Sequence, residues 1–384
     1  MAKLGGYIEQ IRGVSYKPED VCSSTDNDAV AILRANNIQD DGLHFDDLVY
    51  VKKNKISDRQ YIKKGDIIVC ASSGSKSLVG KAAIASENFP VAFGAFCKVV
   101  RPKKLIPSYT GYFFQSPKYR STISELSGGA NINNIRNEHI DELDIVIVSE
   151  KEQESIVNQL DALSNLIFLR KQQLSKLDEL VKSRFIELFG KCKEQKRLEE
   201  YAPLITKGAS PKWQGVDYCE EGTLFVTSEN VREGYLDLSK RKYLDDKINE
   251  IQPRSILKRN DILINIVGAS IGRAAVYDCD EAANINQAVA LVRVDYSQIN
   301  QTYLMTFLNS PQAIEMYGKM KKGGARDNLS LQNIADLQIP IAPIELQKQF
   351  AAFVEQTDKS KLAIQKSLEK LETLKKALMQ QYFG

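Results

Sequence analysis

The residues of this sequence best suited to chemistry form a glycine-rich run, GSKSLVGK, from Gly74 to Lys81. Its outline is that of a phosphate-binding loop, in which backbone amides and a lysine hold the phosphates of a nucleotide. Five residues separate its glycines, however, and Ala82 stands where a magnesium-binding hydroxyl should follow. A similar later run, GASIGR from Gly268 to Arg273, is shorter and replaces the lysine by arginine. These departures predict that neither run binds a nucleotide.

Other catalytic arrangements lack their partners. The two histidines, His44 and His139, have no supporting motif for a Ser-His-Asp triad. Glu194-Gln195-Lys196 has the Glu-x-Lys spacing of many nucleases, but no convincing aspartate precedes it. A dinucleotide-binding glycine pattern and an Asn/Asp-Pro-Pro-aromatic tetrapeptide are missing, and the six cysteines never stand at a CxxC spacing. The sequence therefore predicts no catalytic residue and no metal site.

Lysine, arginine and amide side chains recur instead on turn-rich segments. Lys and Arg neutralise DNA phosphates, and Arg, Asn and Gln hydrogen-bond to base edges. Scattered solubilising charge is the alternative, since the net charge is only +3. The only tryptophan lies on one such segment, although a lone tryptophan is more typical of a core. The candidate DNA contacts are Lys52, Lys53, Ser75, Lys76, Lys81, Asn131, Lys212, Trp213, Asn230, Arg273, Asn286, Gln287, Lys322 and Arg326.

Length and composition favour two folded domains. The chain has 384 residues, of which 43% are hydrophobic and 26% charged, which is ordinary for a globular protein. It has no apolar run of about 18 residues, so no transmembrane helix is expected. The first residues lack the apolar region of a signal peptide. We therefore expect a cytoplasmic protein.

The chain repeats itself at an offset of 194 residues. Phe189-Gly190 and Phe383-Gly384 close two similar runs rich in leucine and lysine. Chance does not easily supply many further matches in the same order, so we interpret the sequence as a tandem duplication. The matched positions include Leu4 with Leu198, Tyr7 with Tyr201, Tyr109 with Tyr303, and Ser116-Pro117 with Ser310-Pro311.

Each copy has the same internal plan. Short β-rich runs with glycine and Asn/Asp turns come first, followed by a helical segment and a short strand. Each copy then closes with a run free of Gly and Pro, at 150–189 and at 345–383. These runs predict two long helices, each about 60 Å in length at 1.5 Å per residue.

The apolar residues of the two helices form a narrow stripe at a spacing of three and four residues. Such a stripe is typical of a coiled-coil seam, although Arg170, Lys361 and Lys375 interrupt it. We expect the helices to act as spacers that pair with each other. The residues expected in the pairing are Leu160, Leu163, Ile167, Leu174, Leu177, Val181, Val354, Ile364, Leu368, Leu371 and Leu378.

The segments that lead into the two helices resemble a known family. They read IPIAPIELQKQF at 339–350 and, in degraded form, IVIVSEKEQESI at 145–156. The stretches GGARDNLSLQNI and GGANINNIRNEHI precede them. Over essentially its full length the chain resembles the DNA-specificity subunit of type I restriction–modification systems.

The resemblance implies an α+β fold of two tandem repeats. Each repeat would be a mixed α/β target recognition domain followed by a long α-helix, with the two helices paired as an antiparallel coiled coil with pseudo-twofold symmetry. The corresponding boundaries are 1–149 and 191–343 for the recognition domains, and 150–190 and 344–384 for the conserved helical regions.

The resemblance also implies a non-catalytic subunit of a methyltransferase and endonuclease complex. Its recognition domains would each read one half of a split target in double-stranded DNA. Two methylation subunits would carry S-adenosylmethionine, and restriction subunits would carry ATP and magnesium, so this chain would bind no cofactor and no membrane. On this hypothesis, a change in helix length changes the spacer between the half-sites.

The copies differ where the helices begin, because Val146 and Ser149 stand in place of Pro340 and Pro343. The two helix starts, and the docking of partners there, are therefore expected to differ. A coiled-coil scaffold whose globular domains bind other proteins is the main alternative. An enzyme with an unrecognised site is a third, for which binding of S-adenosylmethionine to the isolated chain is the discriminating observation.

Overall fold

The computed structural model describes residues 1–126, 133–192, 194–320 and 328–384. The chain forms two compact units. The first unit comprises residues 1–171 and 365–384, and the second comprises residues 172–364. Each unit therefore contains one globular body and parts of both long helices.

The first unit is built on a four-stranded antiparallel sheet of order β2-β11-β7-β9. A three-stranded sheet of order β10-β3-β6 stands beside it, with β10 parallel to β3. The larger strands are β2 (Ile8–Arg12), β3 (Ala29–Leu33), β6 (Val49–Lys52), β7 (Ile67–Cys70), β9 (Ala82–Ile84), β10 (Val91–Phe93) and β11 (Cys97–Pro102). The small pairs are β1 (Ala2–Lys3) with β13 (Asp144–Ile145), β4 (Ile38–Gln39) with β5 (Gly42–Leu43), and β8 (Ser72–Ser73) with β12 (Asn133–Asn134). The short helices are α1 (Pro107–Phe113), α2 (Pro117–Leu126) and α3 (Asn137–Asp141).

The second unit repeats this plan. Its main sheet has the order β15-β22-β19-β20, and its second sheet has the order β16-β18-β17-β21, with β21 parallel to β17. The main-sheet strands are β15 (Leu204–Lys207), β19 (Ile262–Asn265), β20 (Ala274–Val276) and β22 (Val289–Arg293). The other strands are β14 (Gln195–Arg197), β16 (Tyr218–Cys219), β17 (Thr223–Val226), β18 (Tyr243–Leu244), β21 (Ala283–Ile285) and β23 (Gln338–Pro340). The short helices are α5 (Lys247–Ile251), α6 (Gln301–Leu308), α7 (Pro311–Met320) and α8 (Leu331–Ala335).

The central strand of each main sheet is apolar on both faces. In β7, Ile67 and Val69 belong to one hydrophobic core, while Ile68 and Cys70 belong to another. Side chains alternate across a strand, so a continuous apolar run of this kind can fill two cores at once. Strand β19 does the same in the second unit. The matching runs DIIVC and DILIN therefore form the strand at the same position of the main sheet in both copies.

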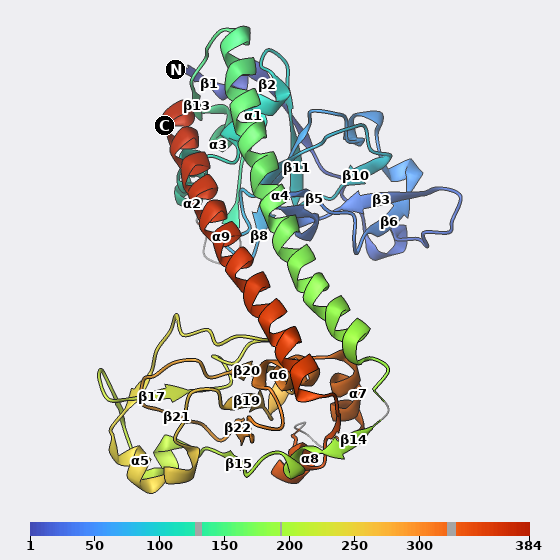
Figure 1. Ribbon diagram of the computed structural model, residues 1–384. Helices are drawn as coiled ribbons and strands as arrows, with labels where there is room; N and C mark the ends of the chain where they lie inside the picture. The colour runs from blue at the N-terminus through green and yellow to red at the C-terminus, as the bar shows by residue number, and fades with distance from the viewer. Residues whose placement is uncertain (127–132, 193, 321–327) are drawn as a thin grey trace. The chain divides into compact units, whose positions relative to one another are not determined.

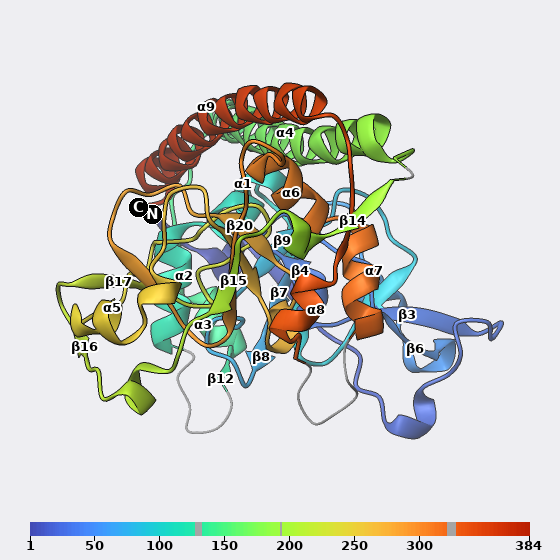
Figure 2. The same ribbon diagram turned by 60° about the horizontal axis from the view of Figure 1, so that its bottom comes forward.

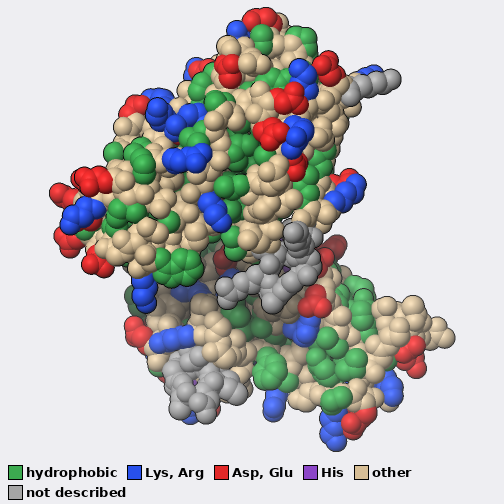
Figure 3. Space-filling model, turned by 90° about the horizontal axis from the view of Figure 1, so that it is seen from below, with side chains coloured by type: hydrophobic (Ala, Val, Ile, Leu, Met, Phe, Trp, Pro, Cys, Tyr) green, Lys and Arg blue, Asp and Glu red, His purple; other side chains and the backbone are tan. Residues whose placement is uncertain are grey.

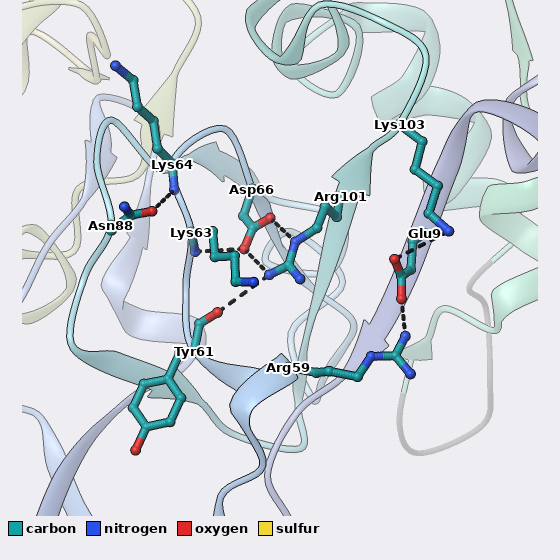
Figure 4. Close-up of polar contacts among 9 residues, drawn as sticks. All are labelled: Glu9, Arg59, Tyr61, Lys63, Lys64, Asp66, Asn88, Arg101 and Lys103. Atoms are coloured by element: carbon teal, nitrogen blue, oxygen red, sulfur yellow. Dashed lines mark hydrogen bonds and ion pairs between the residues drawn. The ribbon is translucent and has the colours of Figure 1, made fainter.

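A buried ion pair occupies the same place in both units. Arg101 donates to both carboxylate oxygens of Asp66 at 2.7 Å, and Arg293 does the same to Asp261 at 2.6 and 2.7 Å. Figure 4 shows the first pair, with the backbone amide of Lys63 donating to the same carboxylate. The carboxylate raises the pKa of each arginine, mainly through these hydrogen bonds. The duplication thus extends to individual polar contacts.

A glutamine and a tyrosine also make equivalent bonds in both units. Gln153 accepts from the amide of Ile106, and Gln347 accepts from that of Asn300. The hydroxyl of Tyr109 donates to the carbonyl of Val146, and that of Tyr303 donates to the carbonyl of Pro340. These bonds tie each long helix and the strand before it to the globular body that precedes them in the sequence.

The two long helices, α4 (Glu150–Phe189) and α9 (Ile344–Phe383), run side by side (Figures 1 and 2). In the first unit, Leu160 near the start of α4 shares a core with Met379 near the end of α9. In the second unit, Phe185 near the end of α4 shares a core with Phe350 near the start of α9. The helices are therefore antiparallel, which confirms the predicted pairing.

The predicted pairing residues lie on the covered faces of the two helices. Leu160, Leu163 and Val354 are buried. The other eight are partly buried, namely Ile167, Leu174, Leu177, Val181, Ile364, Leu368, Leu371 and Leu378. The lysines that interrupt the stripe of α9 are accommodated, because Lys361 lies 2.7 Å from Asp178 and the ammonium of Lys375 lies over the ring of Tyr112.

The repeated aromatic-glycine ending has a structural reason. Phe383, at the end of α9, packs on Tyr109 of the first copy, with ring centroids 5.1 Å apart. Phe189, at the end of α4, packs on Tyr303 of the second copy at 4.6 Å. Each long helix thus begins on the globular body of its own copy and ends on that of the other copy.

The two long helices begin differently, as the sequence predicts. Ser149 and Glu152 form a reciprocal capping box at the start of α4, in which the serine amide donates to the glutamate and the glutamate amide donates to the serine hydroxyl. The hydrogen bonds from Ser149 lower the pKa of Glu152. In both helices the backbone carbonyl at this position accepts from the amide three residues later, Ser149 from Glu152 and Pro343 from Leu346. The two starts therefore differ in the capping box, which Pro343 cannot form because it has neither a hydroxyl group nor an amide hydrogen.

Candidate nucleic-acid interface

In each unit, strands of both sheets end or begin at one common edge. In the first unit β2, β7 and β10 end there and β9 and β11 begin there, as the pairing of Cys70 with Cys97 indicates. In the second unit β15, β19 and β21 end there and β20 and β22 begin there. We call the loops at this edge the strand-end loops; they comprise 13–17, 71–81 and 94–96 in the first unit, and 208–213, 227–231, 266–273 and 286–288 in the second.

Backbone hydrogen bonds hold the strand-end loops together. The amides of Ala71 and Ser72 donate to the carbonyl of Phe96, and the carbonyl of Ala71 accepts from Ile135. The second unit repeats this pattern, because Ile266 donates to the carbonyl of Ala288 and accepts from Leu329. The loops of each unit therefore form one connected surface, although they come from distant parts of the sequence.

Two glycines allow the first loop of each unit to approach the turn before β11 or β22. A Cβ atom on Gly13 would lie 2.1 Å from the carbonyl oxygen of Gly94, and one on Gly208 would lie 1.6 Å from that of Ile285. No side chain fits at either position, so glycine is required for close backbone packing. The loop that carries Lys212 and Trp213 starts at this contact.

The second unit has an additional side-chain bridge. Asn265 is fully buried at the end of β19, and its amide nitrogen lies 3.0 Å from the carbonyl of Ser228, 3.2 Å from that of Val231 and 3.1 Å from the hydroxyl of Ser270. It thereby joins loops 227–231 and 266–273. The matching residue of the first unit is Cys70, whose burial raises the pKa of its thiol.

Most candidates of the second unit gather on its strand-end loops. Lys212, Trp213, Arg273 and Gln287 are exposed there, and the side chain of Asn286 accepts from the amide of Ala288. The expectation that a lone tryptophan belongs to a core is wrong for Trp213, which is 85% exposed. Exposed basic, amide and aromatic groups at one edge are suited to contacts with phosphates and bases.

The candidates of the first unit are more divided. Ser75 and Lys76 are exposed on loop 71–81, while Lys81 is partly buried and lies 3.5 Å from Asp40. Lys52 and Lys53 lie beside the start of β3, whereas its end meets the turn at Gly94. These two lysines, placed on the interface by sequence reasoning, therefore stand at the opposite end of that sheet, where they line a pocket that also contains Asp26 and Asp28.

One amide candidate of the second unit has an internal role. Asn230 is buried, accepts from the amide of Thr227 and donates to the carbonyl of Asp237. Its side chain thus shapes loop 227–231, and the prediction that Asn230 contacts DNA at the surface is corrected.

Three further candidates, Asn131, Lys322 and Arg326, lie outside the described residues. Next to the loop of Asn230, hydrogen bonds from Ser239 hold the pKa of the Asp237 carboxyl below its usual range.

Sequence reasoning missed one exposed aromatic residue at this edge. Phe96 is 66% exposed in the turn between β10 and β11. A signal was present, because the repeat aligns the segment ending in GAFCK with the one containing INQAV, and the two differ at the turn. Apolar residues were expected in strands, so the loop position of this phenylalanine was not recognised.

Charge alone does not mark an interface. On the face drawn in Figure 3, Lys and Arg side chains are dispersed among acidic and uncharged ones.

Among the described residues, no group of three or more His, Cys, Asp or Glu could hold a metal ion. No described helix is long and apolar enough to cross a membrane. The strand-end loops are distinguished instead by combining exposed basic, amide and aromatic side chains, namely Lys212, Gln287 and Trp213.

Known proteins share both the sequence and the fold. The family described as "Type I restriction modification DNA specificity domain" matches residues 4–179 and again 193–376. The type I restriction enzyme EcoKI specificity subunit of Escherichia coli (strain K12) is 31% identical over 373 residues, which cover 90% of this chain and 79% of that protein. The StySPI specificity subunit of Salmonella potsdam is 43% identical over 173 residues, which cover 45% of this chain and 37% of that protein.

Two solved structures have a similar fold. The type I restriction-modification system S subunit from M. genitalium matches with a TM-score of 0.56 at 15% identity, covering 100% of this chain and 95% of that one. A chain from a study of complex assembly and conformational transition of the type I R-M system matches with a TM-score of 0.58 at 17% identity, covering 98% and 97%. Because the family match spans both copies and nearly the whole sequence, the chain belongs to the type I restriction–modification DNA specificity subunit family.

Proposed function

We propose that this specificity subunit binds a bipartite sequence in double-stranded DNA, with one half-site at the strand-end loops of each unit. The observation that carries the proposal is the contrast between a conserved internal frame and divergent loops. Arg101 with Asp66 and Arg293 with Asp261 make the same buried contacts in both units. In the strand-end loops, by contrast, Ala95-Phe96 of the first copy aligns with Gln287-Ala288 of the second. A common scaffold with different loops suits two readers of different sequences.

We further propose that the chain acts without catalysing a reaction itself. Two methylation subunits would dock on it and carry S-adenosylmethionine, and restriction subunits would carry ATP and magnesium. The absence of any recognisable nucleotide-binding or metal-binding motif in the sequence supports this division of labour. Because its ligand is cellular DNA, the proposed place of action is the cytoplasm.

The DNA-binding role predicts a strong salt dependence. For a complex of this chain with its methylation subunits, the affinity for a target duplex is expected to fall by about 10³-fold or more between 50 and 200 mM salt, since phosphate contacts release counterions. Fluorescence anisotropy with labelled DNA measures this directly. The methylation subunits without this chain are the control, and they are expected to lack preference for the target. Equal, salt-independent binding with and without this chain would favour a protein-binding scaffold.

A further inference from the structure

The turn that joins the two sheets is the same in both units. The carbonyl of Gly94 accepts from Cys97 at 2.8 Å, and the carbonyl of Asn286 accepts from Val289 at 3.2 Å. In each turn the fourth residue begins a central strand of the main sheet, β11 or β22. The turn is therefore anchored at both ends by strands, and its central residues project from a fixed backbone.

Each turn has two central residues, of which one is alanine and the other is large. In the first unit these are Ala95 and Phe96, and in the second they are Gln287 and Ala288. Phe96 and Gln287 are both exposed, and neither side chain belongs to a hydrophobic core. The ring of Phe96 is 66% exposed, so most of its apolar surface contributes nothing to the core of the unit and is accessible to a partner.

The two side chains have different chemistry for reading DNA. A glutamine amide can donate to and accept from the major-groove edge of adenine, whereas an apolar side chain contacts the methyl group of thymine. The carbonyl of Phe96 accepts from Ala71 and Ser72, which fixes the turn that presents its exposed ring. In the second unit the carbonyl of Ala288 accepts from Ile266, which fixes the turn beside Gln287 in the same way.

We infer that this turn is a specificity-determining element of both units. Phe96 contacts a thymine methyl group in one half-site, and Gln287 hydrogen-bonds to a base edge in the other. The inference rests on the proposed function, because it assigns particular residues to the reading of the two half-sites. It assigns a base contact to Phe96, which composition and charge do not indicate. It also assigns the base contact in the second unit to Gln287 and not to its neighbour Asn286, whose side chain is hydrogen-bonded within the turn.

The test uses the full complex with its methylation subunits and three forms of this chain: wild type, Phe96→Ala and Gln287→Ala. Methylation rates are measured on a library in which every position of both half-sites is varied. Phe96→Ala is expected to reduce discrimination at one position of one half-site by about fourfold, the value of one buried methyl group. Gln287→Ala is expected to reduce discrimination by about 5- to 150-fold in the other half-site only, so each variant serves as the control for the other.

Uracil in place of thymine gives a sharper readout, since it removes only the methyl group. For the wild-type complex, the methylation rate is expected to fall about fourfold when one particular thymine in the first unit's half-site is replaced by uracil. The complex with Phe96→Ala is expected to methylate the thymine and uracil DNA at equal rates. The complex with Phe96→Leu is expected to keep part of the difference. Thermal unfolding of each variant checks that the unit remains folded, as expected for side chains outside the core.

The outcomes separate the inference from the proposed function. If the wild-type complex shows no bipartite preference, both are wrong. If the wild type reads a bipartite target but Phe96→Ala and Gln287→Ala leave every position unchanged, the inference alone is wrong. Relaxation of both half-sites by one variant, or a wild type insensitive to uracil throughout the first unit's half-site, also contradicts it.

Discussion

Replacing Asp261 with alanine is expected to lower the free energy of unfolding of the second unit by about 3–5 kcal/mol. The carboxylate is fully buried and accepts two hydrogen bonds from Arg293 and one from the amide of Lys258. Its removal leaves a partly buried guanidinium without its counter-charge and a backbone amide without an acceptor. A loss of this size is a large fraction of the stability of an ordinary domain.

Hydrogen exchange or limited proteolysis, which report on each unit separately, measures this effect. Asp66→Ala is the matched variant of the first unit and is expected to destabilise that unit instead. Asp280→Ala breaks an ion pair with Arg259 in which both side chains are largely exposed, so it is expected to change little. The explanation fails if the second unit is as well protected from exchange and proteolysis in the Asp261→Ala variant as it is in the Asp280→Ala variant.

Lengthening both long helices by seven residues is expected to lengthen the DNA spacer by about three base pairs. Seven residues add about 10.5 Å to a helix, and DNA rises about 3.4 Å per base pair. A full heptad preserves the apolar stripe, so the inserted residues continue the existing pairing. Suitable positions follow Lys171 in α4 and Ile364 in α9, where the chain passes between the two units.

Methylation of a panel of targets with spacers of different length measures the shift. An insertion in α4 alone is the control, because it shifts one helix against the other and is expected to abolish activity on the whole panel. Recognition of the original spacer by the doubly extended protein would show that the helices do not set the separation. Loss of all recognition in folded protein would contradict the account in the same way.

The overall architecture could be predicted because the repeat and the helical stripe are properties of the sequence itself. Two runs without Gly or Pro locate α4 and α9, and short continuous apolar runs locate the central strands β7 and β19. Periodicity alone did not predict whether Phe383 would dock on Tyr109 or on Tyr303, since both aromatic partners occur in equivalent contexts. That choice depends on how the helices pair, which periodicity does not specify.

The candidate interface was harder to predict because residue type does not reveal burial within a turn. Asn230 and Gln287 are both amides in turn-rich segments, yet one is buried by its own loop and the other is exposed. Lys52 lies in a lysine-rich segment, but strand pairing places it at the far end of β3. Only the register of the strands brings the strand-end loops together, and register depends on contacts distant in sequence.

The most direct test of the central claim is to map methyladenine in genomic DNA from cells with and without this gene. Bipartite recognition predicts that one motif with two short half-sites and an unread spacer is methylated only when the gene is present. Restoring the gene with Phe96→Ala is expected to return the same spacer and a motif relaxed in one half-site. An unchanged methylation pattern after loss of the gene, in cells that express its methylation subunits, would contradict the account.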